Sequence, residues 1–193
     1  MNAANALRRL IRSFDTWLSR RLQVYPFSDA EGIILRIQRG KAPYDLHLPD
    51  GRIPRGAPVL LLHLWNERLP VPPEGHTLAW ATIFRRQIRN SLCALAQHLQ
   101  QTRDFSDILA LGGSTAHLTL EHPAAEKLLL HLGFSIFPYS SPVGRFGEFW
   151  ENFYTWWLIW AYNPESASRH PMWKLRRVSF WIERRAFIER YAR

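Results

Sequence analysis

The chain has 193 residues, of which 25 are Lys or Arg and 16 are Asp or Glu, and its formal net charge is +9. This length fits a single domain, and 47% hydrophobic residues with 13% aromatic residues exclude a disordered or low-complexity chain. No uncharged run is long and unbroken enough to predict a membrane-spanning helix. The single cysteine, Cys93, excludes an internal disulfide and is typical of a protein in a reducing compartment.

The positive charge is concentrated at the two ends of the chain. Residues 1–24 have a net charge of +4 and residues 169–193 a net charge of +6, whereas residues 25–168 have a net charge of −1. We therefore expect the ends to bind an anionic surface or an acidic polymer, with peripheral membrane contact as one form of this. The candidate anion-binding residues near the C-terminus are Arg176, Arg177, Arg184 and Arg185. Nucleic acid is not expected, because the chain has no recognition-helix, zinc-finger or stacking-strand motif.

The first predicted element is an amphipathic helix within residues 1–24. Its apolar positions recur at helical spacing, with arginines and serines between them: Leu7, Leu10, Ile11, Phe14, Trp17, Leu18 and Leu22. We expect this helix to pack on a single mixed α/β domain formed by residues 25–193, because a one-sided apolar stripe usually faces a core. An organelle transit peptide and a membrane-surface helix are the alternatives.

The next elements are strands. Residues 33–37 and 44–48 have strand patterns, and the second of these runs into a turn at residues 49–51. Residues 59–65 form a near-continuous apolar run, which predicts the central strand of a sheet, buried on both faces. After a proline-rich break, residues 80–99 have the apolar stripe of a long helix.

The second half of the chain alternates short strands with helices. We expect strands at residues 108–111, 116–120, 134–137 and 175–182, with a turn at residues 112–115. The expected helices are one bounded by Pro123 and Gly133, one over residues 146–162 that ends at Asn163-Pro164, and one over residues 183–191. The order predicts the α/β class, with a mixed sheet of about five to seven strands and helices on both faces.

One candidate catalytic cluster follows the run at residues 59–65. Polar side chains occur here at the carboxyl end of the expected central strand, which is where open α/β sheets bind ligands. His63 would act as a general base oriented by Glu67, with Asn66 or Arg68 holding an anionic group. The alternative is a structural cluster in which these side chains satisfy backbone groups at a strand end.

A second candidate is the glycine-containing segment at residues 112–115. Backbone amides at Gly113, Ser114 and Thr115 would bind an anion if the segment were an exposed loop. A plain turn between strands explains the composition better, because the nucleophile-elbow and phosphate-loop signatures are both absent. No metal and no cofactor are expected, since the eight histidines have no ligand spacing and Cys93 has no second thiol.

Residues 146–162 have a broad aromatic face. On a helix this face would pack against the core or a partner, or enter a lipid interface. We expect packing, because the opposite face has Glu148, Glu151 and Asn152 instead of the Lys and Arg of membrane-surface helices.

Several short motifs resemble the bacterial YkoP-like domain family. They are His63-Leu64-Trp65-Asn66 after three leucines, Leu132-Gly133-Phe134, the aromatic helix that runs into Asn163-Pro164, and Phe180-Trp181-Ile182 before Arg184 and Arg185. The family occurs alone or joined to polysaccharide deacetylases, so the resemblance implies an accessory role in an envelope polysaccharide or lipid context. It implies no activity for particular residues. We accordingly expect a cytoplasmic protein, peripheral at the inner membrane.

The predicted order of elements is also similar to that of GCN5-related N-acyltransferases. That resemblance implies an acyl-CoA ligand whose pyrophosphate lies on backbone amides between the central strand and the long helix, here residues 65–77. The Gln/Arg-x-x-Gly-x-Gly/Ala motif of that superfamily is absent. The alternative function is therefore an acyltransferase that uses acyl-CoA, with His63, Asn66 and Glu67 at its centre.

Overall fold

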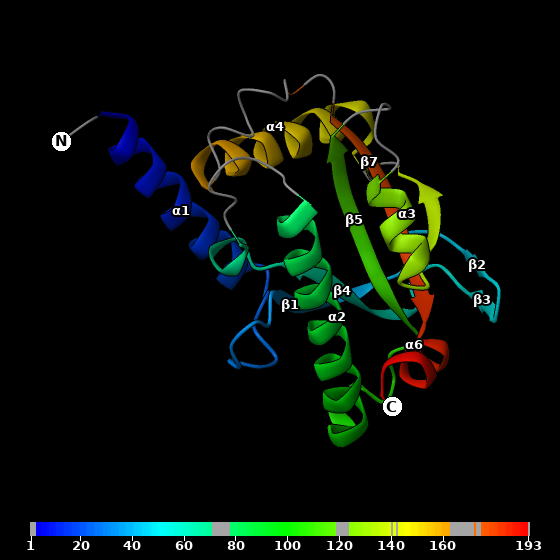
Figure 1. Ribbon diagram of the computed structural model, residues 1–193. Helices are drawn as coiled ribbons and strands as arrows, with labels where there is room; N and C mark the ends of the chain where they lie inside the picture. The colour runs from blue at the N-terminus through cyan, green and yellow to red at the C-terminus, as the bar shows by residue number, and fades with distance from the viewer. Residues whose placement is uncertain are drawn as a thin grey trace.

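A computed structural model describes residues 3–70, 78–118, 124–139, 141, 143–162, 172 and 175–192. A mixed sheet with the strand order β1-β4-β5-β7-β6 forms its centre, and helices lie on both faces (Figure 1). The helices are α1 (Ala3–Arg21), α2 (Leu78–Gln101), α3 (Ala124–His131), α4 (Gly144–Tyr162) and α6 (Arg184–Tyr191). The strands are β1 (Leu35–Lys41), β2 (Leu46–Leu48), β3 (Gly51–Ile53), β4 (Pro58–Leu64), β5 (Ala110–Leu118), β6 (Ser135–Pro138) and β7 (Leu175–Glu183), and the short helix η1 is Asn66–Arg68.

Strands β4 and β5 form the one parallel pair of the sheet in the described part of the chain, and α2 connects them. Their ladder pairs only Val59 to Leu61 with Ala110 to Gly112, although both strands continue beyond it. The pairs β1–β4, β5–β7 and β7–β6 are antiparallel. The sheet is thus mixed, as the sequence predicts.

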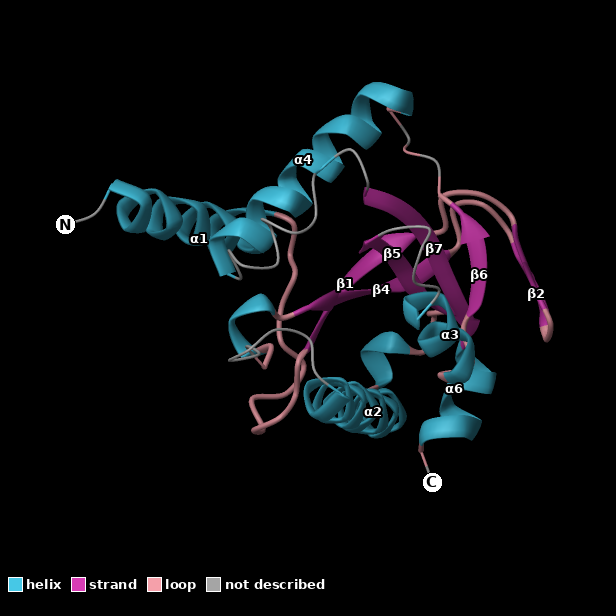
Figure 2. Cartoon of the chain, turned by 45° about the horizontal axis from the view of Figure 1, so that its top comes forward, coloured by secondary structure: helices cyan, strands magenta, loops and turns pink. Residues whose placement is uncertain are grey.

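Each face of the sheet has its own apolar cluster. Helices α2, α3 and α6 cover one face, and Figure 2 shows them on the same side of the strands. The β2–β3 hairpin and α4 cover the other face, where the cluster is smaller. Residues 59–62 of β4 contribute alternately to both clusters, which confirms that this run is buried on both faces. The central position belongs to β5, however, because β7 returns from the end of the chain and inserts between β5 and β6.

The turn expected at residues 112–115 is wrong, since these residues lie inside β5 and pair with β7. The glycine at position 112 is explained by close packing. A Cβ atom there would lie 2.1 Å from the Phe180 carbonyl oxygen and 2.5 Å from Cε3 of Trp181. Glycine at this position therefore lets the Trp181 ring lie flat against β5, and it does not mark a break in the chain.

Some expectations fall outside the described residues. These are the helix limits at Pro123 and Asn163-Pro164, most of the connection at residues 65–77, and the end of the expected strand at residues 116–120. Among the described helices, none combines the length and the apolar character that a membrane-spanning segment requires.

The packing at Gly112 generates a prediction for stability. Gly112→Ala should lower the free energy of unfolding by about 3 kcal/mol, the upper part of the usual range for overpacking, because the backbone of β7 cannot move away. Urea denaturation measures this difference. Gly113→Ala is the matched control in the same strand, because the nearest atom to its Cβ would be 3.3 Å away and the loss should be clearly smaller. Equal losses in the two variants would contradict the close-packing explanation.

Candidate functional site

Helix α1 packs against the C-terminal half of α4, and a buried carboxylate lies at the centre of this contact. The Asp15 carboxylate is 5% exposed, and it accepts hydrogen bonds from the Tyr154 hydroxyl at 2.7 Å and from the Tyr162 hydroxyl at 3.5 Å. Burial and the nearby carboxylates raise the pKa of both tyrosines, so their hydroxyls stay protonated and act as donors. The sequence patterns did not predict a role for these three residues, although a single acidic residue on an Arg-rich helix could have indicated one for Asp15.

Two arginines of α1 complete the contact with α4. The Arg8 guanidinium lies 5.1 Å from the ring centroid of Trp160, and the Arg12 guanidinium lies 4.8 Å from that of Tyr162. Arg12 also donates a hydrogen bond of 2.9 Å to the Ala161 carbonyl. These are cation–π contacts that fix α1 to α4 at the edge of the molecule.

The apolar stripe of α1 faces outward. Ile11 is fully buried, but Leu10 is 63% exposed and Trp17 is 58% exposed, and Leu7 and Phe14 on the same stripe are exposed as well. The helix does pack on the domain, yet it does so through the side that carries Arg8, Arg12 and Asp15. The expectation that this apolar stripe faces the core is therefore wrong.

Exposed aromatic residues continue onto the N-terminal half of α4. Phe146, Phe149 and Trp150 are about half exposed or more, and so is Val143 immediately before the helix. A series of ring contacts runs from them along the helix to Phe153 and Trp157. Separately, the Tyr154 ring meets the Phe14 ring of α1. We call the exposed set the α1–α4 surface, and its residues are Leu7, Leu10, Phe14, Trp17, Val143, Phe146, Phe149 and Trp150.

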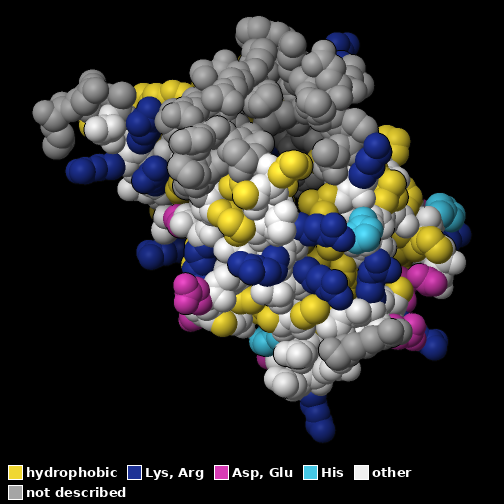
Figure 3. Space-filling model, in the orientation of Figure 1, with side chains coloured by type: hydrophobic (Ala, Val, Ile, Leu, Met, Phe, Trp, Pro, Cys, Tyr) yellow, Lys and Arg dark blue, Asp and Glu magenta, His cyan; other side chains and the backbone are white. Residues whose placement is uncertain are grey.

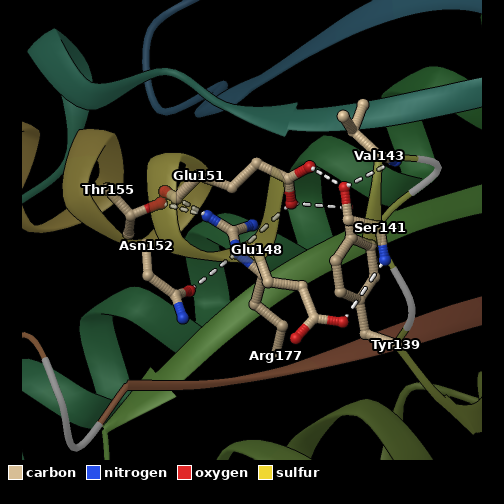
Figure 4. Close-up of polar contacts among 8 residues, drawn as sticks. All are labelled: Tyr139, Ser141, Val143, Glu148, Glu151, Asn152, Thr155 and Arg177. Atoms are coloured by element: carbon tan, nitrogen blue, oxygen red, sulfur yellow. Dashed lines mark hydrogen bonds and ion pairs between the residues drawn. The ribbon is translucent and has the colours of Figure 1, made fainter. Parts of the chain in front are cut away.

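The acidic residues of α4 point away from this surface. Glu151 accepts hydrogen bonds from the hydroxyls of Tyr139 at 2.5 Å and Ser141 at 2.9 Å, as Figure 4 shows. Glu148 accepts from the Ser141 amide at 3.5 Å, which places it on the same inner side. These carboxylates face β6 and its following loop. They therefore give no reason to expect that the exposed side of α4 stays out of a lipid interface.

Arg177 of β7 ties α4 to the sheet. Its guanidinium donates to the Asn152 side chain at 2.9 Å and to the Glu151 carbonyl at 2.6 Å, and it also donates to the Thr155 hydroxyl. Its Nε lies 3.7 Å from the Glu151 carboxylate, and burial lowers its pKa. Arg177 is thus a structural link between β7 and α4, made through its Nε and Nη2 atoms.

The other C-terminal arginines do not converge on one point. Arg184 donates to the Leu99 carbonyl at the end of α2, and Arg185 pairs with Glu189 on α6 at 2.8 Å. Arg176 is exposed on β7, on the face opposite to Arg177. The N-terminal helix α1 and the C-terminal helix α6 lie at opposite ends of the molecule in Figures 1 and 2. Among the described residues, the arginines of α1 and those of α6 therefore lie on separate surfaces.

The strand-end cluster is only partly assembled. Nε2 of His63 lies 2.9 Å from Oε1 of Gln38 on β1, whereas the exposed Glu67 side chain accepts a hydrogen bond from Tyr162. The Arg68 guanidinium lies 3.7 Å from the Trp65 ring centroid and donates to backbone carbonyls at residues 29 and 30. His63 and Glu67 thus have different partners, and Asn66 lies beside them in η1.

Residues 113–115 do not form the exposed loop on which the anion-binding expectation depends. Gly113, Ser114 and Thr115 pair with residues 178–180 of β7, so their backbone groups belong to a sheet ladder and not to a loop. In the described ranges of the chain, no group of three or more His, Cys, Asp or Glu side chains is arranged to hold a metal ion.

Comparison with known proteins identifies the family. The family model of the YkoP domain matches residues 6–191, which is nearly the whole chain. The chain belongs to the YkoP domain family. The match begins at residue 6 and so covers all of α1 except its first three residues. No curated protein and no solved structure matches the chain.

The environment of His63 generates a pH prediction. Burial, and secondarily the charge of Arg36, lower the pKa of His63 from 6.5 to about 4, so the folded protein keeps this ring neutral where the unfolded chain protonates it. Stability is therefore lost as the pH falls from 6.5 towards 4, by up to roughly 3 kcal/mol from this residue. His63→Gln should be less sensitive to acid over this interval in urea denaturation at several pH values. A wild-type slope in the variant would show that His63 does not cause this loss.

Proposed function

We propose that this YkoP domain binds anionic membrane surfaces through the α1–α4 surface. The observation that carries the proposal is the outward apolar stripe of α1, with Arg9 exposed in the N-terminal half of the helix and Arg20 and Arg21 exposed in its last turn. Helices that lie on membranes combine an apolar face with flanking arginines, and their Trp and Phe side chains enter the interface. The envelope context implied by the family resemblance supports a membrane as the partner.

Charge favours a membrane over a second copy of the chain. The one acidic residue of α1, Asp15, is buried against α4, and the acids of α4 face inward. Two α1 helices brought together would repel each other, because neither offers an exposed carboxylate to the arginines of the other. An anionic lipid surface supplies the missing negative charge, and each arginine near it contributes about 1 kcal/mol.

Neutralising the exposed arginines should weaken membrane binding. The triple variant R9Q/R20Q/R21Q should bind vesicles containing phosphatidylglycerol about 100-fold more weakly than the wild type, as three contributions of about 1 kcal/mol imply. Co-sedimentation with sucrose-loaded vesicles measures this, and binding should fall as salt is added. The control K41Q/R55Q/R103Q removes the same charge from exposed side chains on β1, the loop after β3 and the turn after α2, and should bind like the wild type.

The apolar part of the surface is tested separately. L10S/W17S should also reduce vesicle binding, by tenfold or more, because both side chains would no longer enter the interface. Analytical ultracentrifugation of the wild type should show a monomer. A dimer that L10S/W17S dissociates, or vesicle binding equal in the triple variant and its control, would refute the membrane proposal.

A second candidate function, acyl transfer from acyl-CoA, is favoured by the β4–β5 pair. The ladder ends at Leu61 and Gly112 while both strands continue, so two strand edges face each other there without ladder bonds. A ligand with amide groups, such as the pantetheine arm of acyl-CoA, can pair with edges of this kind. His63 lies at this end of β4.

Acyl-CoA binding should then raise the melting temperature of the wild type. The variant N66A/E67A should lose this shift, because both side chains lie at the carboxyl end of β4 where the acyl group would be held. Thermal denaturation with a series of CoA thioesters measures the effect. A flat response across the series would remove this candidate.

A further inference from the structure

A second positively charged site lies away from the α1–α4 surface, between α2, α3 and α6. It is a cavity of about 210 Å³ lined by Arg85, Arg89, His131, Leu132, Arg190 and Tyr191. In Figure 3, dark-blue side chains gather around a histidine over these helices. No carboxylate is among the lining residues, so nothing in the cavity wall neutralises the three guanidinium groups.

Two hydrogen bonds connect α6 to the end of α3 at the floor of the cavity. The Arg190 guanidinium donates a hydrogen bond of 2.7 Å to the His131 carbonyl at the C-terminus of α3, and the Tyr191 hydroxyl donates one of 2.6 Å to the Leu132 carbonyl. Gly133 has a φ of +89°, and a Cβ atom there would lie 3.0 Å from Nε of Arg190. The glycine therefore leaves room for the arginine side chain to lie across the turn after α3.

The wall formed by α2 presents donors in the same direction. Nη2 of Arg85 lies 2.6 Å from Nε2 of His131, and because a guanidinium only donates, Nε2 is the acceptor in this contact. Arg89 is one helical turn beyond Arg85 and lines the same cavity. The nearest acid along α6, Glu189, forms an ion pair with Arg185. Arg85, Arg89 and Arg190 are exposed, so water screens their mutual repulsion, and an anion bound between them would reduce it further.

We propose that this cavity binds a phosphate group. Guanidinium groups donate pairs of hydrogen bonds that match phosphate oxygens, and three of them complement a group with a double negative charge. The volume is smaller than the roughly 300–1,000 Å³ of sites that enclose a drug-sized ligand, so the cavity fits the phosphate group and not the rest of a larger molecule. This site is independent of the membrane proposal, because it shares no residue with the α1–α4 surface.

Isothermal titration at constant ionic strength tests the proposal with inorganic phosphate and pyrophosphate as probes. The wild type should bind pyrophosphate with a stoichiometry of one, and R85Q and R190Q should each weaken binding tenfold or more, as loss of a charged hydrogen bond implies. R86Q is the matched control, since Arg86 is the exposed neighbour of Arg85 on α2 and does not line the cavity. It should change the affinity by less than twofold.

The titrations decide whether the cavity binds phosphate and from which kind of molecule. No binding of either probe, or equal weakening by R86Q and R85Q, would overturn the proposal, and R85Q decides the matter if R190Q does not fold. Soluble dihexanoylphosphatidic acid distinguishes the source of the phosphate: binding as tight as that of pyrophosphate identifies a lipid headgroup, and weaker binding identifies a free phosphate. R85Q should bind phosphatidylglycerol vesicles like the wild type. Vesicle binding therefore tests the membrane proposal, and pyrophosphate binding tests the phosphate proposal separately.

Discussion

The carboxylate of Asp15 determines which side of α1 meets the solvent. A buried carboxylate is costly unless it is hydrogen-bonded, and here two tyrosine hydroxyls of α4 supply the bonds. Arg12 and Arg8 lie about one and two turns before Asp15 on the same side, so their contacts with aromatic rings of α4 add to the same orientation. The apolar stripe then points outward as a direct consequence, because the polar side of the helix is the one that has partners.

Strand β7 connects the two candidate sites. Near its start, Arg177 reaches α4 and so supports the helix on which α1 rests. At its end, the chain continues into α6, which brings Arg190 and Tyr191 to the cavity. Between these points the Trp181 ring lies against Gly112 of β5. The position of β7 in the sheet thus determines the position of both surfaces.

Local patterns predicted the class of the fold and most of its elements, because alternation and apolar runs report directly on burial. They failed at Gly112, where the reason for glycine is a tryptophan almost 70 residues away in the chain. They failed for α1 as well, because amphipathicity shows that a helix has two sides but not which side a partner covers. Counting charges along the chain also gave no sign that Nε and Nη2 of Arg177 donate to α4. The phosphate cavity could not be predicted, because it needs α2, α3 and α6 together.

The placement of the arginines on α1 also determines how the helix would lie on a flat surface. Arg8 and Arg12 are held against aromatic rings, so an approaching surface meets Arg9 in the N-terminal half of the helix and Arg20 with Arg21 in its last turn. At 1.5 Å per residue these two positions are about 17 Å apart, which is greater than the Debye length of about 8 Å at physiological salt. The two positions therefore act as separate points of attachment. Attachment at both requires the axis of α1 to be parallel to the surface, which excludes an end-on orientation.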